Sequence, residues 1–263
     1  MTRVLSGAVL LVFAVAIVWF APRLLFFAVA ELLLVLGCWE FAGLARASGL
    51  RVAVVESSLA AALCCASVAG VIRLSGQLDV VLLAALVVIG VGALVTWNGG
   101  RDAVAAVSAS MFPSIYLGLP IGAMVVVREG WGARGLFLLM LTVVVSDSAQ
   151  YYSGRTFGRT PLAPSVSPKK TIEGAVGGFI FGAACLAVVG AWWLPGVPPV
   201  ARALLGIVIV TMGIVGDLFE SMLKRSAGVK DSSALIPGHG GILDRIDALL
   251  FAAPVYYIAL KYL

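Results

Sequence analysis

Long apolar runs follow one another through almost the whole chain, and their length limits what the chain can fold into. A helix needs about 20 mostly apolar residues to cross the hydrocarbon core of a bilayer. Nine windows of the 263-residue sequence approach that length with few charges. They are residues 6–20, 24–44, 52–72, 80–97, 103–127, 135–152, 172–193, 200–223 and 246–262. We therefore predict an all-α, polytopic integral membrane protein with about nine transmembrane helices.

The composition leaves little room for a separate soluble domain. Hydrophobic residues make up 62% of the chain and charged residues 12%, whereas a soluble domain carries roughly 25% charged residues. We predict one membrane domain over residues 1–263, in which the helices of 1–130 serve packing or dimerisation and those of 135–263 carry the chemistry. The first apolar run resembles a signal peptide, but a second run follows at once, so we expect it to be retained. The lipid bilayer is an expected partner, and nucleic acid is not.

The distribution of lysine and arginine predicts an orientation, because cytoplasmic loops carry the excess of positive charge. With the N-terminus in the cytoplasm, twelve of these residues fall on the inner side and six on the outer side. This bias favours an N-in, C-out topology. It also places two long loops, residues 154–171 and 226–243, in the cytoplasm.

The segment GDLFESMLKR, residues 216–225, gathers charge near the end of the eighth window. Asp217, Glu220, Ser221 and Lys224 have the spacing of one helix face. Carboxylates are costly in a membrane span, so they need a partner. That partner is either Lys224, which would make the group a structural salt-bridge cluster, or a bound cation.

The segment HGGILDRID, residues 239–247, opens the last window. Asp244 and Asp247 lie three residues apart at a predicted helix start, where capping alone would explain acidic side chains. Hard cations such as Mg²⁺ prefer carboxylate oxygens. Asp217 together with Asp244 and Asp247 would therefore suit a divalent metal site.

Glycines surround the only histidine of the chain, His239. Gly238 precedes it, and Gly240 and Gly241 follow. Glycine lets backbone N–H groups approach an anion closely. A lone histidine is usually structural, but this setting favours a functional one.

The loop from 146 to 174, SDSAQYYSGRTFGRTPLAPSVSPKKTIEG, is rich in cations. Ser167 and Pro168 read as the N-cap and first residue of the next helix. A helix N-terminus beside lysines is an anion site, although positive-inside topology and lipid headgroup contact are simpler explanations. The four cations of the loop are Arg155, Arg159, Lys169 and Lys170.

Two further patterns leave their role open. The early windows contain or adjoin three acids, and an intramembrane acid is a functional candidate by position, but no spacing links these acids to the later cluster. They are Glu31, Glu40 and Glu56. Gly174, Gly178 and Gly182 repeat at four-residue steps, which favours close helix packing either within the chain or across a dimer face.

The stretch SMLKRSAGVKDSSALIPGHGGILDRID, residues 221–247, closely resembles the signature of phosphatidate cytidylyltransferases, also called CDP-diacylglycerol synthases. That pattern is a serine, then KR, then KD, an apolar residue with Pro-x-HGG, and DR-x-D. GDLFES and the 147–174 loop also resemble family motifs. Gln150 departs from the pattern, since a small or apolar residue is expected there.

The resemblance implies transfer of CMP from CTP to phosphatidic acid, giving CDP-diacylglycerol and pyrophosphate for phospholipid biosynthesis. It implies a multi-pass protein of the cell (inner) membrane whose active site faces the cytoplasm. The expected cofactor is Mg²⁺ or Mn²⁺, and the number of carboxylates leaves room for a second cation such as K⁺.

Within that reaction we assign roles to the motif residues. The catalytic set is Asp217, Lys224, His239, Asp244 and Asp247, of which Asp217, Asp244 and Asp247 bind metal. The residues assigned to CTP and its phosphates are Lys169, Lys170, Arg225, Lys230, Gly240, Gly241, Arg155 and Arg159.

Two other functions account for part of the pattern. A headgroup transferase that uses a CDP-alcohol usually carries a DG…AR…G…D…D pattern, which this sequence lacks. A transporter or channel would suit buried acids and positive loops, but many transporter folds contain inverted repeats. The sequence has no visible repeat.

Overall fold

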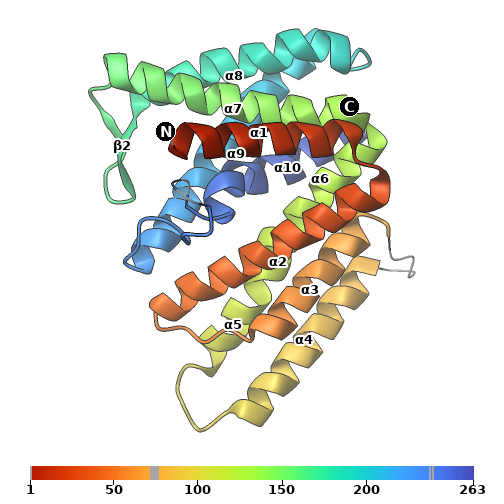
Figure 1. The fold of residues 1–263 in the computed structure, drawn as a ribbon, viewed down its shortest axis with the longest axis vertical. Coiled ribbons are helices and arrows are strands. Elements are labelled where there is room, and N and C mark those ends of the chain that lie inside the picture. Colours follow the sequence, from red (N-terminus) through yellow and green to blue (C-terminus); the bar gives the residue numbers. More distant parts are fainter. Residues whose placement is uncertain (1, 72–76, 237, 239) are drawn as a thin grey trace. The chain divides into compact units, whose positions relative to one another are not determined.

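The computed structural model describes residues 2–71, 77–236, 238 and 240–263, and these residues are largely helical (Figure 1). Each of the nine predicted apolar windows overlaps a helix or a continuous helical stretch in this part of the chain. In chain order the helical elements are α1 (Thr2–Phe20), α2 (Arg23–Ala47), α3 (Val54–Val68), α4 (Gln77–Thr96), α5 (Ala103–Pro113), the π-helix η1 (Ser114–Gly118), α6 (Leu119–Gly130), α7 (Gly132–Phe157), α8 (Ile172–Trp193), α9 (Pro199–Ser226) and α10 (Leu243–Tyr262).

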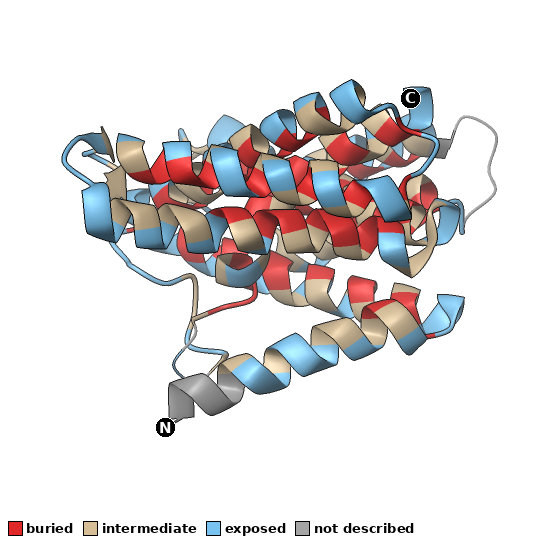
Figure 2. Cartoon of the chain, turned by 90° about the horizontal axis from the view of Figure 1, so that it is seen from above, coloured by how far each residue is buried: buried red, intermediate tan, exposed pale blue. Residues whose placement is uncertain are grey.

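The lengths and compositions of these helices identify an all-α, multi-pass membrane protein. Six helical stretches within the described residues are long and apolar enough to cross a membrane, and α1 and α3 contain shorter apolar segments. Large apolar side chains are exposed on many helices, including Phe20 (83%) and Val104 (81%). Figure 2 shows buried and exposed residues alternating along single helices. Lipid tails would cover such apolar exposure.

The chain divides into two compact units, which we describe separately. Unit 1 contains Met1–Val126 and Leu223–Arg245, and unit 2 contains Val127–Met222 and Ile246–Leu263. The loop between α9 and α10, which carries most of the 221–247 motif, therefore belongs with the N-terminal helices. In unit 1, α3 packs against α2, α4, α5 and η1 (Figure 1).

A π-helical turn interrupts the fifth predicted window. Pro113 ends α5 and has no N–H to donate to the preceding turn, which favours a local change of hydrogen-bonding pattern. The π-helix η1 follows at once and leads into α6. The chain approaches α3 closely there, since a Cβ on Gly118 would lie 2.6 Å from the Ala61 carbonyl oxygen. A window predicted as one span is therefore one continuous but irregular helix.

In unit 2, α7 and α8 lie side by side with glycines at their contact (Figure 1). A Cβ on Gly174 would lie 2.8 Å from the Gln150 carbonyl oxygen, and one on Gly178 would lie 2.6 Å from Gln150 Cγ. A Cβ on Gly182 would meet Val210 of α9 at 2.6 Å. The glycine pattern thus serves helix packing within the chain.

The connection between α7 and α8 corrects one prediction. It forms an antiparallel hairpin of β1 (Pro161–Ala163) and β2 (Ser167–Thr171), so Ser167 and Pro168 do not begin a helix. The N-cap of α8 is Thr171, whose Oγ1 accepts a hydrogen bond from the Gly174 N–H at 3.1 Å. Threonine caps a helix by the same chemistry as serine, and pairing with β1 extends the strand to this later residue.

Candidate functional site

The predicted site residues fall into groups within each unit. In unit 1 we define the Asp244 cluster as Glu40, Lys224, Ser232, Ser233, Gly241, Ile242, Leu243 and Asp244. In unit 2 we define the Asp217 cluster as Asp147, Gln150, Lys170, Asp217 and Ser221.

Both carboxylate oxygens of Asp244 accept hydrogen bonds from the protein. Lys224 Nζ donates to its Oδ1 at 2.6 Å, and the side chains of this pair are only 11% and 6% exposed. Oδ2 accepts hydrogen bonds from the Ser232 N–H (2.9 Å), Ser232 Oγ (2.8 Å) and the Gly241 N–H (2.8 Å). Burial alone would raise the pKa of Asp244, but these donors together hold the pKa below its ordinary value of 3.8.

The glycines of the motif allow this arrangement. The turn closes through the Ile236 N–H, which donates to the Gly240 carbonyl at 2.8 Å. Gly240 has a positive φ of 77°, and a Cβ there would lie 2.6 Å from Asp244 Oδ2. A Cβ on Gly241 would collide with Ser232 Oγ and both carboxylate oxygens of Glu40. In this structure the Gly241 N–H faces a carboxylate of the protein itself. His239 lies outside the described residues.

Glu40 is the residue whose connection to the motif was missed from the sequence. Its side chain lies in α2, is 1% exposed, and faces the loop before α10. Its oxygens contact two serine hydroxyls and two backbone N–H groups, from Ser232, Ser233, Ile242 and Leu243. An acid inside an apolar window was the available signal, but its partners are 192 to 203 residues away in the chain.

The Asp217 cluster is more open. Lys170 Nζ lies 2.7 Å from Asp217 Oδ2, and these side chains are 20% and 30% exposed. Ser221 Oγ donates a long hydrogen bond of 3.4 Å to Asp217 Oδ1. Asp147 interacts electrostatically with both Asp217 and Lys170 and accepts a hydrogen bond from Gln150 Nε2 at 3.1 Å. Two carboxylates and one ammonium therefore share this place.

Asp247 lies where α9 and α10 approach each other closely in unit 2. A Cβ on Gly216, in α9, would lie 2.5 Å from the Asp247 carbonyl oxygen in α10. Asp247 Oδ1 also accepts a hydrogen bond from the Ala248 N–H at 2.8 Å. Because Gly216 has no side chain, α10 can pack closely against α9 at the position just before Asp217.

The remaining predicted cations lie at the surface. Arg155 Nη1 donates to Tyr151 Oη at 3.2 Å, and Arg225 Nη1 donates to the Val229 carbonyl at 2.8 Å. Arg159, Lys169 and Lys230 are exposed. These side chains are accessible to a soluble anion.

The carboxylates fit a hard cation by chemistry, although within the described residues no group of three or more His, Cys, Asp or Glu side chains is arranged to hold a metal ion. Asp217 and Asp244 are each paired with a lysine ammonium. Carboxylate oxygens are the ligands that Mg²⁺ prefers. A metal ion at either aspartate would have to displace the ammonium or share the carboxylate with it.

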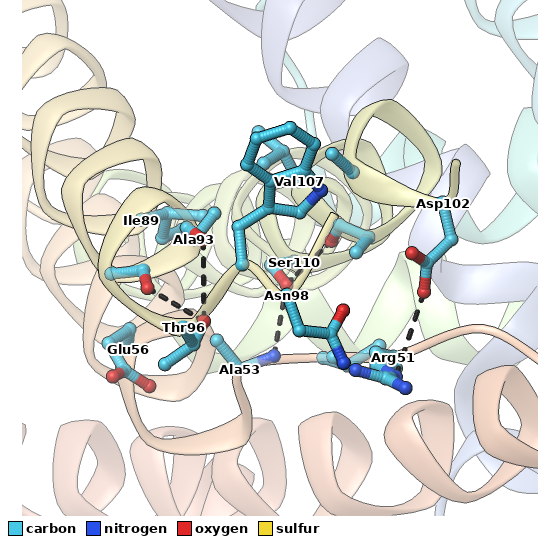
Figure 3. Close-up of a pocket in the computed structure, with 15 residues that line it drawn as sticks. Arg51, Ala53, Glu56, Ile89, Ala93, Thr96, Asn98, Asp102, Val107 and Ser110 are labelled. Carbon is cyan, nitrogen blue, oxygen red and sulfur yellow. Dashed lines mark hydrogen bonds and ion pairs between the residues drawn. The ribbon is translucent and has the colours of Figure 1, made fainter. Parts of the chain in front are cut away.

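Unit 1 also contains two cavities. One of about 340 Å³ adjoins the Asp244 cluster between α2 and the loop of residues 229–234, and Arg46 and Asp231 are among its lining residues. The other, of about 330 Å³, lies where α3, α4 and α5 meet (Figure 3). The Arg51–Asp102 pair is part of its lining, with Arg51 Nε 3.6 Å from Asp102 Oδ2. None of the described residues in our predicted site lines this second cavity.

Comparisons with known proteins agree with the motif. A phosphatidate cytidylyltransferase of Mycobacterium tuberculosis is 40% identical over 159 residues, which cover 60% of this chain and 48% of the relative. Those of Aquifex aeolicus and Haemophilus influenzae are 42% and 47% identical over 123 and 131 residues, covering 47% of this chain and 46% and 45% of each relative. The chain thus spans about half the length of the curated relatives it matches. The model of the Cytidylyltransferase family matches residues 1–263, so the chain belongs to that family.

Proposed function

We propose that this protein transfers CMP from CTP to phosphatidic acid, giving CDP-diacylglycerol and pyrophosphate. The Asp244 cluster is the observation that carries the proposal. There Lys224 and Gly241 of the 221–247 motif both donate to the buried carboxylate of Asp244. Family membership and relatives named phosphatidate cytidylyltransferase support the same reaction.

In the proposed reaction a phosphate oxygen of phosphatidic acid attacks the α-phosphorus of CTP, and pyrophosphate leaves. The nucleophile is already anionic, so the protein need not supply a strong general base. Its main task is to bring two polyanions together, which requires positive charge on several sides. We assign phosphate contacts to the described cations of both loops and to His239. The described cations are Lys169, Lys170, Lys224, Arg225 and Lys230, with Arg155 and Arg159 as further candidates.

We propose Asp217, Asp244 and Asp247 as the ligands of Mg²⁺ or Mn²⁺, which would neutralise phosphate charge when bound. Their carboxylate chemistry supports this assignment, and a second cation such as K⁺ is part of the same proposal. Chelation by EDTA should abolish turnover, and added Mg²⁺ should restore it. Full turnover in EDTA would remove the metal from the mechanism.

We propose that all nine windows cross the cell (inner) membrane with the N-terminus inside and the site facing the cytoplasm, where CTP is found. The two-to-one bias of lysine and arginine supports this topology. In a cysteine-free background, Lys230→Cys should react with a membrane-impermeant thiol reagent only from the cytoplasmic side. A homodimer is also proposed, and the mass of the purified particle tests it.

The decisive experiment incubates purified protein with labelled CTP and phosphatidic acid vesicles. We expect CDP-diacylglycerol and pyrophosphate in equal amounts, and no product when phosphatidic acid is omitted. Consumption of CDP-diacylglycerol with a free alcohol would instead identify a headgroup transferase. Solute uptake into proteoliposomes without CTP turnover would identify a carrier, and either result would overturn the proposal.

A further inference from the structure

We infer that Glu40 is a positioning residue that holds Asp244 and the start of α10 in their working geometry. This inference rests on the proposed function for its catalytic meaning, but its structural part stands on contacts within unit 1. Glu40 lies in the second helix, far in sequence from the 221–247 motif. The motif therefore gives no indication that Glu40 contacts it.

The contacts use both oxygens of the Glu40 carboxylate. Oε1 accepts hydrogen bonds from Ser233 Oγ (2.7 Å) and the Ile242 N–H (2.9 Å). Oε2 accepts from Ser232 Oγ (3.0 Å) and the Leu243 N–H (2.8 Å). A carboxylate with 1% exposure and four such donors is held in one orientation.

Two of these donors are the N–H groups of Leu243, where α10 starts, and of Ile242, the residue before it. The first N–H groups of a helix have no partner within it, and the helix dipole favours negative charge there. Glu40 therefore caps α10 from a different helix. Asp244 is the second residue of α10, so its backbone position follows directly from this contact.

Ser232 connects the two carboxylates. Its Oγ lies 3.0 Å from Glu40 Oε2 and 2.8 Å from Asp244 Oδ2, and its single proton can serve only one of them at a time. The Ser232 N–H adds a contact to Asp244 at 2.9 Å. Moving Glu40 would therefore disturb Asp244 by two routes, through α10 and through Ser232.

Space around the carboxylate is filled on the loop side as well. A Cβ on Gly241 would collide with both oxygens of Glu40, so this glycine leaves the room that the carboxylate occupies. Gly241, the second glycine of the His-Gly-Gly sequence, is thus matched to an acid on α2. Gly241, Ser232 and Asp244 form one packed group around Glu40.

The test compares Glu40→Gln, Glu40→Ala and Glu31→Gln. Glutamine keeps the shape of Glu40 but turns an N–H donor toward groups that already donate. Glu31 is a partly buried acid on the same helix, outside the Asp244 cluster, so Glu31→Gln is the matched control. Activity is expressed per folded molecule, measured as the monodisperse fraction, which removes any loss due to misfolding alone.

For Glu40→Gln we expect kcat to fall by about 100-fold with little change in KM for CTP, because misplacement of a reacting group by about 1 Å costs that much. Glu40→Ala should fall further, and Glu31→Gln should behave as wild type. Ser233→Ala, which removes one of the donors and leaves the Asp244 contacts, should lose less than Glu40→Gln. Unchanged kcat per folded molecule in Glu40→Gln would overturn the positioning role.

Hydrogen exchange separates this inference from the proposed reaction. Amides of residues 241–243 should exchange faster in Glu40→Gln than in wild type or Glu31→Gln, whether or not CTP turns over. If exchange is unchanged, Glu40 does not hold the loop and the inference fails. If exchange rises but wild type makes no CDP-diacylglycerol, the proposed reaction fails while the structural contact stands.

Discussion

The Asp244 and Asp217 clusters both pair an aspartate with a lysine, yet their surroundings differ. The Lys224–Asp244 side chains are 11% and 6% exposed, and three further donors complete Asp244. The Lys170–Asp217 side chains are 20% and 30% exposed, and Ser221 donates a long hydrogen bond of 3.4 Å to Asp217. Asp244 is therefore built into its loop, whereas the Asp217 carboxylate is more accessible to solvent. The same residue pair can thus be enclosed or partly open.

The largest effect on both stability and activity is expected from Asp244→Asn. The change removes the carboxylate that lies 2.6 Å from the nearly buried Lys224 ammonium, and breaking a buried ion pair costs about 3–5 kcal/mol. We expect a lower thermal unfolding midpoint together with loss of CTP-dependent turnover, while membrane insertion persists. A midpoint equal to that of wild type would show that the pair is not structural.

Asp217→Asn should abolish turnover to the same extent but change stability little. Partly exposed ion pairs contribute about 0–1 kcal/mol, so the unfolding midpoint should stay close to that of wild type. Activity and thermal unfolding measured on one preparation test both statements. Near-normal turnover would remove Asp217 from the proposed metal site, and a large fall in the midpoint would erase the contrast between the two clusters.

The smallest expected effect is a dependence of stability on acid pH. The folded pKa of Asp244 is held below its ordinary value of 3.8, so its contribution is present above that pH and is lost as the pH falls through the folded pKa. In metal-free buffer the unfolding midpoint of wild type should therefore fall more steeply below pH 3.8 than that of Asp244→Asn. Parallel curves would show that the ionised Asp244 carboxylate adds no stability.

Helix positions followed from the sequence because apolar windows report directly on burial in lipid. Local departures were harder to predict. The π-helix after Pro113 differs from an α-helix only in the spacing of its hydrogen bonds, and apolar windows do not report that spacing. Ser167 and Pro168 have the composition of a helix start, but strand pairing between Pro161 and Thr171 prevails there.

The sequence predicted the motif residues of the candidate site, but it did not predict which other residues they contact. The 221–247 segment identified Lys224, Asp244 and the glycines, since they lie within one loop and its flanking helix ends. Spacing suggested either Lys224 or a bound cation as the partner of Asp217 and Glu220. It did not suggest the pairs of Lys224 with Asp244 and of Asp217 with Lys170. Glu40 could not be assigned, because no periodicity relates residues that are about 200 positions apart.

The distance in sequence between Glu40 and Leu243 also determines the order of assembly during synthesis. The two residues are separated by 203 positions, and ribosomes add roughly 5–20 residues per second. Glu40 therefore enters the membrane about 10–40 seconds before its backbone partners exist. During that interval the Glu40 carboxylate lacks its backbone donors, so it must be stabilised by water, by lipid headgroups or by protonation. The start of α10 completes the environment of an acid on α2, so a chain truncated before residue 242 lacks two of the four donors to that acid.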